Sequence, residues 1–274
     1  MARYSDKFGV KEVMDVTFYD LESFEPVLYI DTLKMSNLEN TAEESEARGG
    51  RGNPILLTWD YNREANFTIQ DALIAPDGLA LLSGMERGDL FPGTARVYER
   101  EVIPLAGDTG VETIVLQHEA IAEDRIFVYD VYHGIAAGEL TLDGVTLSNI
   151  DGVTEIDIDA DLVEEVDNIK QVVVYYPYER TDLDGPLQTI TISSDDFPGY
   201  YRVVGDTLIR NARTGLDEPF QLVVHRAKIL PGFTITMEAE GDPSVFDMNL
   251  KVMRPLDRTT MIEMTKYSDA DAGS

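Results

Sequence analysis

Short runs of alternating apolar and polar residues recur along most of the chain, and turn-forming residues separate them. Examples are Val13–Asp20, Val27–Leu33 and Ile156–Leu162. Alternation with a period of two places one set of side chains on each face of a strand. Glycine, proline, asparagine and aspartate between the runs supply the turns. The spacing predicts a mainly β chain, folded as an antiparallel β-sandwich or barrel.

Further runs extend this pattern. The runs 55–61 and 65–69 predict a strand pair about Asn62-Arg63-Glu64. No repeat of fixed period relates the runs. We therefore expect one large β domain over residues 1–267, followed by a small, polar and frayed tail at 268–274. The other expected strands lie at 95–103, 113–116, 125–131, 139–147, 172–176, 187–192, 200–204, 208–211, 220–224, 233–239, 246–253 and 261–264.

One segment favours a helix. Residues 71–84 carry Pro76 at a plausible first helical position and Gly84 at the place where a helix would end. The sequence therefore predicts one flanking α-helix at about 71–84. A buried stripe against the sheet is expected from Ile74, Leu79 and Leu82.

The segment Ser36–Asn53 departs from the alternating pattern. It is polar and acidic, and it ends in the glycine-rich run Arg48-Gly49-Gly50-Arg51-Gly52-Asn53. We interpret the glycines as a loop, and the acidic stretch before them is compatible with an extended arm. A phosphate-binding P-loop is not supported, because no lysine follows and the next residues resemble a strand rather than a helix.

The charge balance restricts the possible partners. The 274 residues include 22 basic and 51 acidic side chains, which gives a formal net charge of −29. Binding DNA or RNA needs basic clusters that neutralise phosphates, so an acidic surface repels nucleic acid. Two explanations stay open. The surface is acidic for solubility or salt adaptation, or it faces DNA without binding it.

Several classes of site lack support. The absence of cysteine excludes disulfides, cysteine-ligated zinc, iron–sulfur clusters and cysteine nucleophiles. The histidines His118, His133 and His225 have no ligand spacing, and no nucleophile-elbow motif accompanies them. The acidic run Asp157–Asp161 fails the EF-hand pattern at its sixth and twelfth positions. We expect no catalytic residue, metal or cofactor, no signal peptide and no membrane-spanning segment.

Two stretches share an order of elements with a known family. The first runs from Ala47 through the glycine-rich turn to Leu82-Ser83-Gly84, and the second runs from Phe220 to Met248. The order is a strand pair, one helix ending at Leu-Ser-Gly, later strands, and a Glu-Gly-Asp-Pro turn before a closing strand. It resembles that of bacteriophage tail tube (major tail) proteins. The middle, about 85–200, is expected to hold an insertion or an outward-facing subdomain.

The resemblance implies a structural virion protein rather than an enzyme. Tail tube subunits form a β-sandwich flanked by a helix and close into rings, usually hexameric, whose inner strands line a channel. Stacked rings carry the genome from the capsid to the host. The implied partners are other copies of the chain, other tail proteins, and genomic DNA that passes without specific binding. The implied location is the virion tail, assembled in the host cytoplasm.

By the same resemblance, Ser36–Asn53 is the candidate for an inter-strand loop that controls polymerisation. Its arginines would pair with carboxylates on an adjacent subunit. An acidic lumen would centre the DNA by repulsion over about 8–10 Å at moderate salt. Its lining would come from Glu238 and Glu240, or from Asp157, Asp159 and Asp161. The candidate interface residues are Arg48, Gly49, Gly50, Arg51, Gly52 and Asn53.

Two other readings stay open. A capsid decoration protein or another head or tail part would bind a preformed structure instead of polymerising. A β-sandwich carbohydrate-active enzyme would use two carboxylates, with Trp59 or tyrosines as sugar platforms. Because 51 acidic residues guarantee chance pairs, the enzyme reading needs a cleft that holds a carboxylate of raised pKa.

Overall fold

The chain is mainly β, with antiparallel sheets, as the alternating pattern predicts. The computed structural model describes residues 7–107, 109–121, 125–131, 145–150, 153–165, 167–235, 237 and 245–267, with the backbone alone for 145–150. The chain divides into two compact units. Unit 1 comprises the residues up to Leu90 and those from Ile190 onward, and unit 2 comprises Phe91–Thr189.

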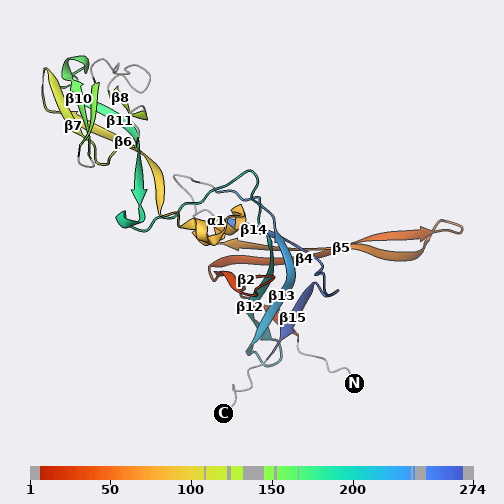
Figure 1. Cartoon of the computed structure of the whole chain (residues 1–274). Coiled ribbons are helices and arrows are strands. Elements are labelled where there is room, and N and C mark those ends of the chain that lie inside the picture. Colours follow the sequence, from red (N-terminus) through yellow and green to blue (C-terminus); the bar gives the residue numbers. More distant parts are fainter. Residues whose placement is uncertain are drawn as a thin grey trace, which may run out of the picture. The chain divides into compact units, whose positions relative to one another are not determined.

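Unit 1 is built on a nine-stranded sheet, counted over the described residues. Its strand order is β3-β2-β12-β13-β14-β5-β4, with β1 added beside β12 and β15 beside β13 (Figure 1). The strands are β1 (Phe8–Val10), β2 (Asp15–Asp20), β3 (Pro26–Ile30), β4 (Leu33–Arg48), β5 (Ile55–Asp71), β12 (Tyr200–Asn211), β13 (Asp217–Ile229), β14 (Phe246–Val252) and β15 (Ile262–Lys266).

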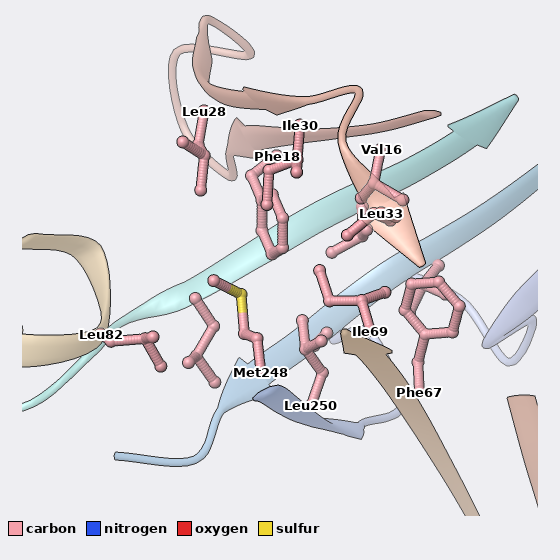
Figure 2. Packing of buried hydrophobic residues seen from close by; sticks show 14 of the residues in the cluster. Val16, Phe18, Leu28, Ile30, Leu33, Phe67, Ile69, Leu82, Met248 and Leu250 are labelled. Carbon is pink, nitrogen blue, oxygen red and sulfur yellow. The ribbon is translucent and has the colours of Figure 1, made fainter. Parts of the chain in front are cut away.

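The sheet of unit 1 curls around one core. Leu28 of β3 and Phe67 of β5 come from near opposite ends of the strand order, yet both are buried in the same hydrophobic cluster. Figure 2 shows the side chains of β2 and β3 facing those of β5 and β14, with Leu82 reaching in from the helix. Curling lets β2, β3, β5, β12, β13 and β14 bury their apolar faces in one core without a second sheet from elsewhere.

Helix α1 (Pro76–Ser83) is shorter than predicted, but its end signals are correct. Pro76 lies in the first turn, and Gly84 ends the helix in a left-handed conformation, φ 77°. The Gly84 amide donates to the Leu81 carbonyl and the Met85 amide to that of Ala80, at 3.3 and 3.0 Å, which is a Schellman ending. The predicted start was wrong, because residues 72–75 precede the helix.

The predicted stripe of α1 is correct for two of its three residues. Leu79 and Leu82 are buried in the core of unit 1. Ile74 lies before the helix and is exposed, so its assignment was wrong. The 3₁₀-helix η1 (Arg87–Leu90) follows and buries Leu90.

A long hairpin replaces the loop predicted at Ser36–Asn53. Residues 36–48 belong to β4, which pairs with β5 along nearly its whole length. Gly49–Pro54 form the turn, so the loop predicted at the glycines is correct, and the acidic stretch before them is extended. The inter-strand loop expected over all of Ser36–Asn53 is wrong for residues 36–48. The turn predicted at Asn62–Glu64 was also wrong, because β5 runs through it without interruption. Figure 1 shows the hairpin projecting beyond the rest of the unit 1 sheet.

In its described residues, unit 2 is a small sandwich of two three-stranded antiparallel sheets. Their orders are β7-β10-β9 and β6-β11-β8, and side chains from both fill one hydrophobic core. The strands are β6 (Thr94–Leu105), β7 (Val111–Val115), β8 (Phe127–Asp130), β9 (Val145–Ile150), β10 (Val153–Asp159) and β11 (Lys170–Thr181). Two 3₁₀-helices, η4 (Ala160–Leu162) and η5 (Asp182–Asp184), end β10 and β11.

Other strand predictions need correction. Residues 187–192 form no strand, and neither do the described residues of 233–239. The runs 200–204 and 208–211 belong to the single strand β12. Part of the 139–147 prediction, the Glu240–Pro243 turn and the 268–274 tail lie outside the described residues. Alternation within a run is a local signal, whereas a strand also needs a pairing partner.

Candidate assembly surface

The outer half of the β4–β5 hairpin is a two-stranded ribbon with an apolar face. Ten consecutive residues of β5, Ile55–Glu64, are exposed. Leu57, Trp59 and Tyr61 alternate along this strand and are 59%, 54% and 47% exposed. Alternating residues point to one face of a strand, so these three side chains form a continuous apolar strip. Soluble monomers seldom expose such a strip without a partner.

The opposite face of the ribbon is acidic. Asp60 lies across from Glu44, and Thr58 lies across from Glu46. These positions alternate with the apolar strip and therefore point the other way. The exposed ribbon thus carries Leu57, Trp59 and Tyr61 on one side, with Glu43 across from Tyr61, and three carboxylates together with the exposed Leu56 on the other.

A bulge at Asn62 decides to which side of the ribbon the apolar strip points. The pairing changes register between Thr41 and Glu43, and Asn62 adopts a positive φ of 47°. One extra residue in β5 reverses its alternation. In the base of the hairpin the odd-numbered residues of β5, such as Phe67, point to the core. Beyond the bulge the odd-numbered residues point to the opposite side of the ribbon.

Backbone edges are free on both sides of this ribbon. In the described sheet β4 is the last strand, so one of its edges pairs with β5 and the other edge pairs with no described strand. β5 pairs with β14 only over Ala65–Asp71, so Ile55–Glu64 has a free outer edge. Unpaired N–H and C=O groups on an exposed edge favour addition of a strand from another chain.

The six predicted interface residues lie together at the hairpin end. Gly50 and Gly52 adopt positive φ values of 84° and 90°, which glycine reaches without strain. Arg48 lies 2.6 Å from Glu46 of its own strand, whereas Arg51 has no ion pair with any described residue. An intersubunit role for these residues stays a prediction. Of the two arginines, only Arg51 is without an ion pair to a described residue.

The histidines form no joint site in the described structure. His118 in unit 2 stacks on Tyr178, with 4.0 Å between ring centroids, beside a pocket of about 510 Å³. His225 is buried in β13, with its Nε2 3.2 Å from Glu263. His133 lies outside the described residues. Among those residues, no group of three or more histidine or acidic side chains is placed to hold a metal ion.

Carboxylates with a shifted pKa do not resemble a catalytic acid. The pKa of Asp217 is lowered because Arg210 donates to it, and that of Asp257 is lowered by Arg258. Backbone and hydroxyl donors lower the pKa of Asp20 and Asp184. A glycosidase acid needs the opposite shift. Among the described carboxylates with a shifted pKa, every shift is downward, which does not favour the enzyme reading.

The model of one protein family matches nearly the whole chain. The YomU/Tube protein family matches residues 8–267. The chain belongs to the YomU/Tube protein family. Membership agrees with the resemblance to phage tail tube proteins and makes the chain a structural protein of the phage tail. A search of curated proteins gave no match.

Family membership also bears on the remaining expectations. A tube protein is a structural protein, which agrees with the non-enzyme prediction. No helix in the described part is long and apolar enough to cross a membrane. The match includes both units, so unit 2 lies within the family region rather than outside it.

Proposed function

We propose that the chain polymerises with copies of itself into closed rings that stack into a tail tube. The observation that carries this proposal is the β4–β5 ribbon, which has an apolar strip and free backbone edges. An isolated two-stranded ribbon is marginally stable in water. Packing against a neighbouring subunit removes the strip from water and pairs the edges, so assembly stabilises a segment that the monomer leaves exposed.

Burial of the strip favours assembly, and the gain comes from the roughly half of each side chain that the monomer leaves exposed. Full burial of a large apolar side chain contributes about 1.5–3 kcal/mol, and each subunit offers Leu57, Trp59 and Tyr61. The contact is head-to-tail, because the ribbon of one copy meets a different surface of the next. Such contacts give rings when the rotation closes. By resemblance to tail tubes we expect six subunits per ring.

The acidic face of the ribbon is our candidate for the channel lining. If the apolar strip packs against a neighbour, Glu44, Glu46 and Asp60 turn to the opposite side. Carboxylates repel phosphates, so DNA slides without the salt-dependent contacts that lysine or arginine would add. The alternative lining from Asp157, Asp159 and Asp161 would require unit 2 to face the channel. Glu238 and Glu240 lie outside the described residues.

Negative-stain electron microscopy of the purified protein, over a range of concentration and salt, tests this proposal. Hollow rings or tubes are the expected result. A protein that stays monomeric in all conditions, and that does not extend preformed tail initiator complexes, would instead favour a decoration protein. In an infected cell, we expect the subunit to assemble in the host cytoplasm together with other tail proteins. In the finished virion, we expect it in the tail.

Charge reversal at the hairpin end should separate the two arginines. We expect Arg51→Glu to raise the protein concentration needed for assembly several-fold, because an uncommitted cation at the contact becomes an anion. Arg48→Glu should have a smaller effect, because Glu46 already neutralises Arg48. Light scattering against protein concentration measures both. If neither substitution shifts assembly, the arginines do not contact a neighbouring subunit.

A further inference from the structure

One face of unit 2 is aromatic and cationic. On β6, Val97 and Ile103 pack into the sandwich core, so the even-numbered residues point outward. On β11 the odd-numbered residues point outward, because Val172, Val174 and Tyr176 are in the core. We call the outer surface of β6-β11-β8 the aromatic face. It presents Arg96, Tyr98, Arg100, Val102, Phe127, Tyr129 and Tyr175.

The aromatic face is preorganised and is exposed mainly on its outer strands, because Val173 and Pro177 of the central strand β11 are buried. Tyr98 is 71% exposed and Phe127 is 46% exposed. Tyr129 and Tyr175 contact edge to face, with 6.0 Å between ring centroids. Arg100 lies over the Tyr175 ring at 5.9 Å, and its Nε donates to the Tyr175 hydroxyl at 3.3 Å. These contacts hold a guanidinium and two rings in place on a flat sheet, where a partner meets them with little loss of entropy.

The charge of this face is opposite in sign to the net charge of the chain. The chain has more than two acidic residues for each basic one. The outward positions of β6 nevertheless include Arg96 and Arg100 and no carboxylate. The outward acidic residue of β11 is Glu179, which lies across from Arg96 at one end of the face. The aromatic face is therefore a cationic island on an acidic protein.

The other sheet of unit 2 presents the complementary surface. On β10, Ile156 and Ile158 fill the core, so Glu155, Asp157 and Asp159 point outward. On β7, Ile114 is in the core, so Val111, Thr113 and Val115 point outward. We call this the acidic face. Its valines are 72% and 55% exposed, and no basic side chain points outward from β7 or β10.

We propose that the aromatic face of unit 2 docks on the acidic face of unit 2 in a second copy of the chain. Arg96 and Arg100 meet Glu155, Asp157 and Asp159, while Tyr98 and Val102 cover the exposed valines of β7. The two surfaces lie on opposite sides of one sandwich, so the contact is head-to-tail and repeats from copy to copy. It adds a second line of subunit contacts to those of the hairpin.

The size of the faces makes this contact dependent on assembly, so the inference rests on the proposed function. Three strands spaced about 4.8 Å apart and about 17–20 Å long cover on the order of 250–300 Å². A stable isolated dimer buries about 800 Å² per partner. The contact therefore forms only where the tube holds neighbouring copies at a high effective concentration.

Other occupants fit less well. A single-stranded nucleic acid would stack on Tyr98 and Tyr175, but its phosphates would approach a chain of net charge −29 with two arginines to hold them. A sugar would use the rings but would supply no anion to the two arginines. The acidic face of a second copy matches the rings, the arginines and the area together.

Cysteine crosslinking between two variants tests the docking, because the chain has no cysteine of its own. Val102→Cys places a thiol on the aromatic face, and Val115→Cys places one on the acidic face. Full-length chains of each variant are mixed, assembled, and treated with a short bis-maleimide. We expect crosslinked dimers in the mixture at least tenfold above those of either variant alone. Each variant alone reports only contacts between like faces.

Charge exchange tests the same contact by a second route. Adding Arg96→Glu and Arg100→Glu to the Val102→Cys chain should reduce the dimers at least tenfold while tubes still form. Adding Glu155→Lys and Asp157→Lys to the Val115→Cys partner should restore them. Electron microscopy of each sample shows whether tubes are present.

The outcomes separate the two proposals. Tubes without crosslinks in the mixture overturn the docking and leave the proposed function standing. Crosslinks in either variant alone overturn the head-to-tail arrangement. Absence of rings and tubes in every sample, including the unsubstituted chain, overturns the proposed function and the docking with it. Labelled single-stranded DNA that binds the unsubstituted chain, and is released by Arg96→Glu with Arg100→Glu, would assign the face to nucleic acid instead.

Discussion

Replacement of Trp59 by glutamate is expected to abolish tube assembly and to leave the monomer folded. Trp59 is 54% exposed in the middle of the apolar strip, and it lies across from Ser45 on β4. Because the core does not bury it, the free energy of unfolding should change by no more than about 0.5 kcal/mol. At a subunit contact, a buried tryptophan typically contributes about 2–4 kcal/mol, and the new carboxylate would be desolvated. Repeated at every contact of a ring, that loss is prohibitive.

The matched control adds the same charge to the opposite face of the ribbon. Thr58→Glu lies one residue away, beside Glu46 on the acidic side, and should leave assembly nearly unchanged. Sedimentation velocity measures the assembled fraction of both variants, and circular dichroism checks their folding. Assembly of the Trp59→Glu variant at the concentration needed by the unsubstituted protein would show that the apolar strip is not a subunit contact.

Replacement of Gly84 by alanine should destabilise unit 1 by about 2–5 kcal/mol. A left-handed conformation costs a non-glycine residue roughly 1–2 kcal/mol. The added methyl would also lie 2.5 Å from the carbonyl carbon of Phe197, and relieving such an overlap costs about 1–3 kcal/mol more. Backbone atoms cannot rotate away as a flexible side chain does, so α1 and the segment that enters β12 would have to separate.

Gly78→Ala is the same chemical change, but we expect it to raise the free energy of unfolding rather than lower it. Gly78 is in α1, and a methyl there meets no atom within 4 Å. Alanine is favoured over glycine in a helix by about 0.8–1 kcal/mol, so this variant should be slightly more stable. Urea denaturation of both variants gives the two free energies. Equal changes for the two substitutions would mean that neither the conformation nor the Phe197 contact of Gly84 matters.

Helix ends were predictable because their signals are local. Pro76 presets the backbone of a first turn, and Gly84 alone permits the left-handed ending without strain, so both positions could be read from the sequence. The helix start was misplaced at residue 71 because residues 72–75 include no residue type that forbids a helix. Only their position before a proline disfavours one. The strict alternation at Ile156–Leu162 predicted a strand correctly as far as Asp159, whereas Ala160–Leu162 form the 3₁₀-helix η4.

The hairpin could not be predicted, because its pairing is not encoded within either strand. Glu39, Glu43, Glu44 and Glu46 gave β4 the composition of a loop. They form a strand because β5 supplies backbone partners at each position. Conversely, 187–192 has strand-like residues but pairs with no strand among the described residues. At Asn62 a turn and a bulge have the same local signature, and the register of β4 decides between them.

By itself, the sequence determined the β class, the signals at the helix ends, the acidic excess and the absence of catalytic and metal-binding motifs. These follow from residue types and spacings over a few positions. Only the tertiary structure decided which alternating set faces water, and it gathered Leu57, Trp59 and Tyr61 into one strip. It also divided the charges of unit 2 between an aromatic face and an acidic face. The physical reason is that strand pairing and register are set by residues far apart in the chain, whereas alternation states only that two faces exist.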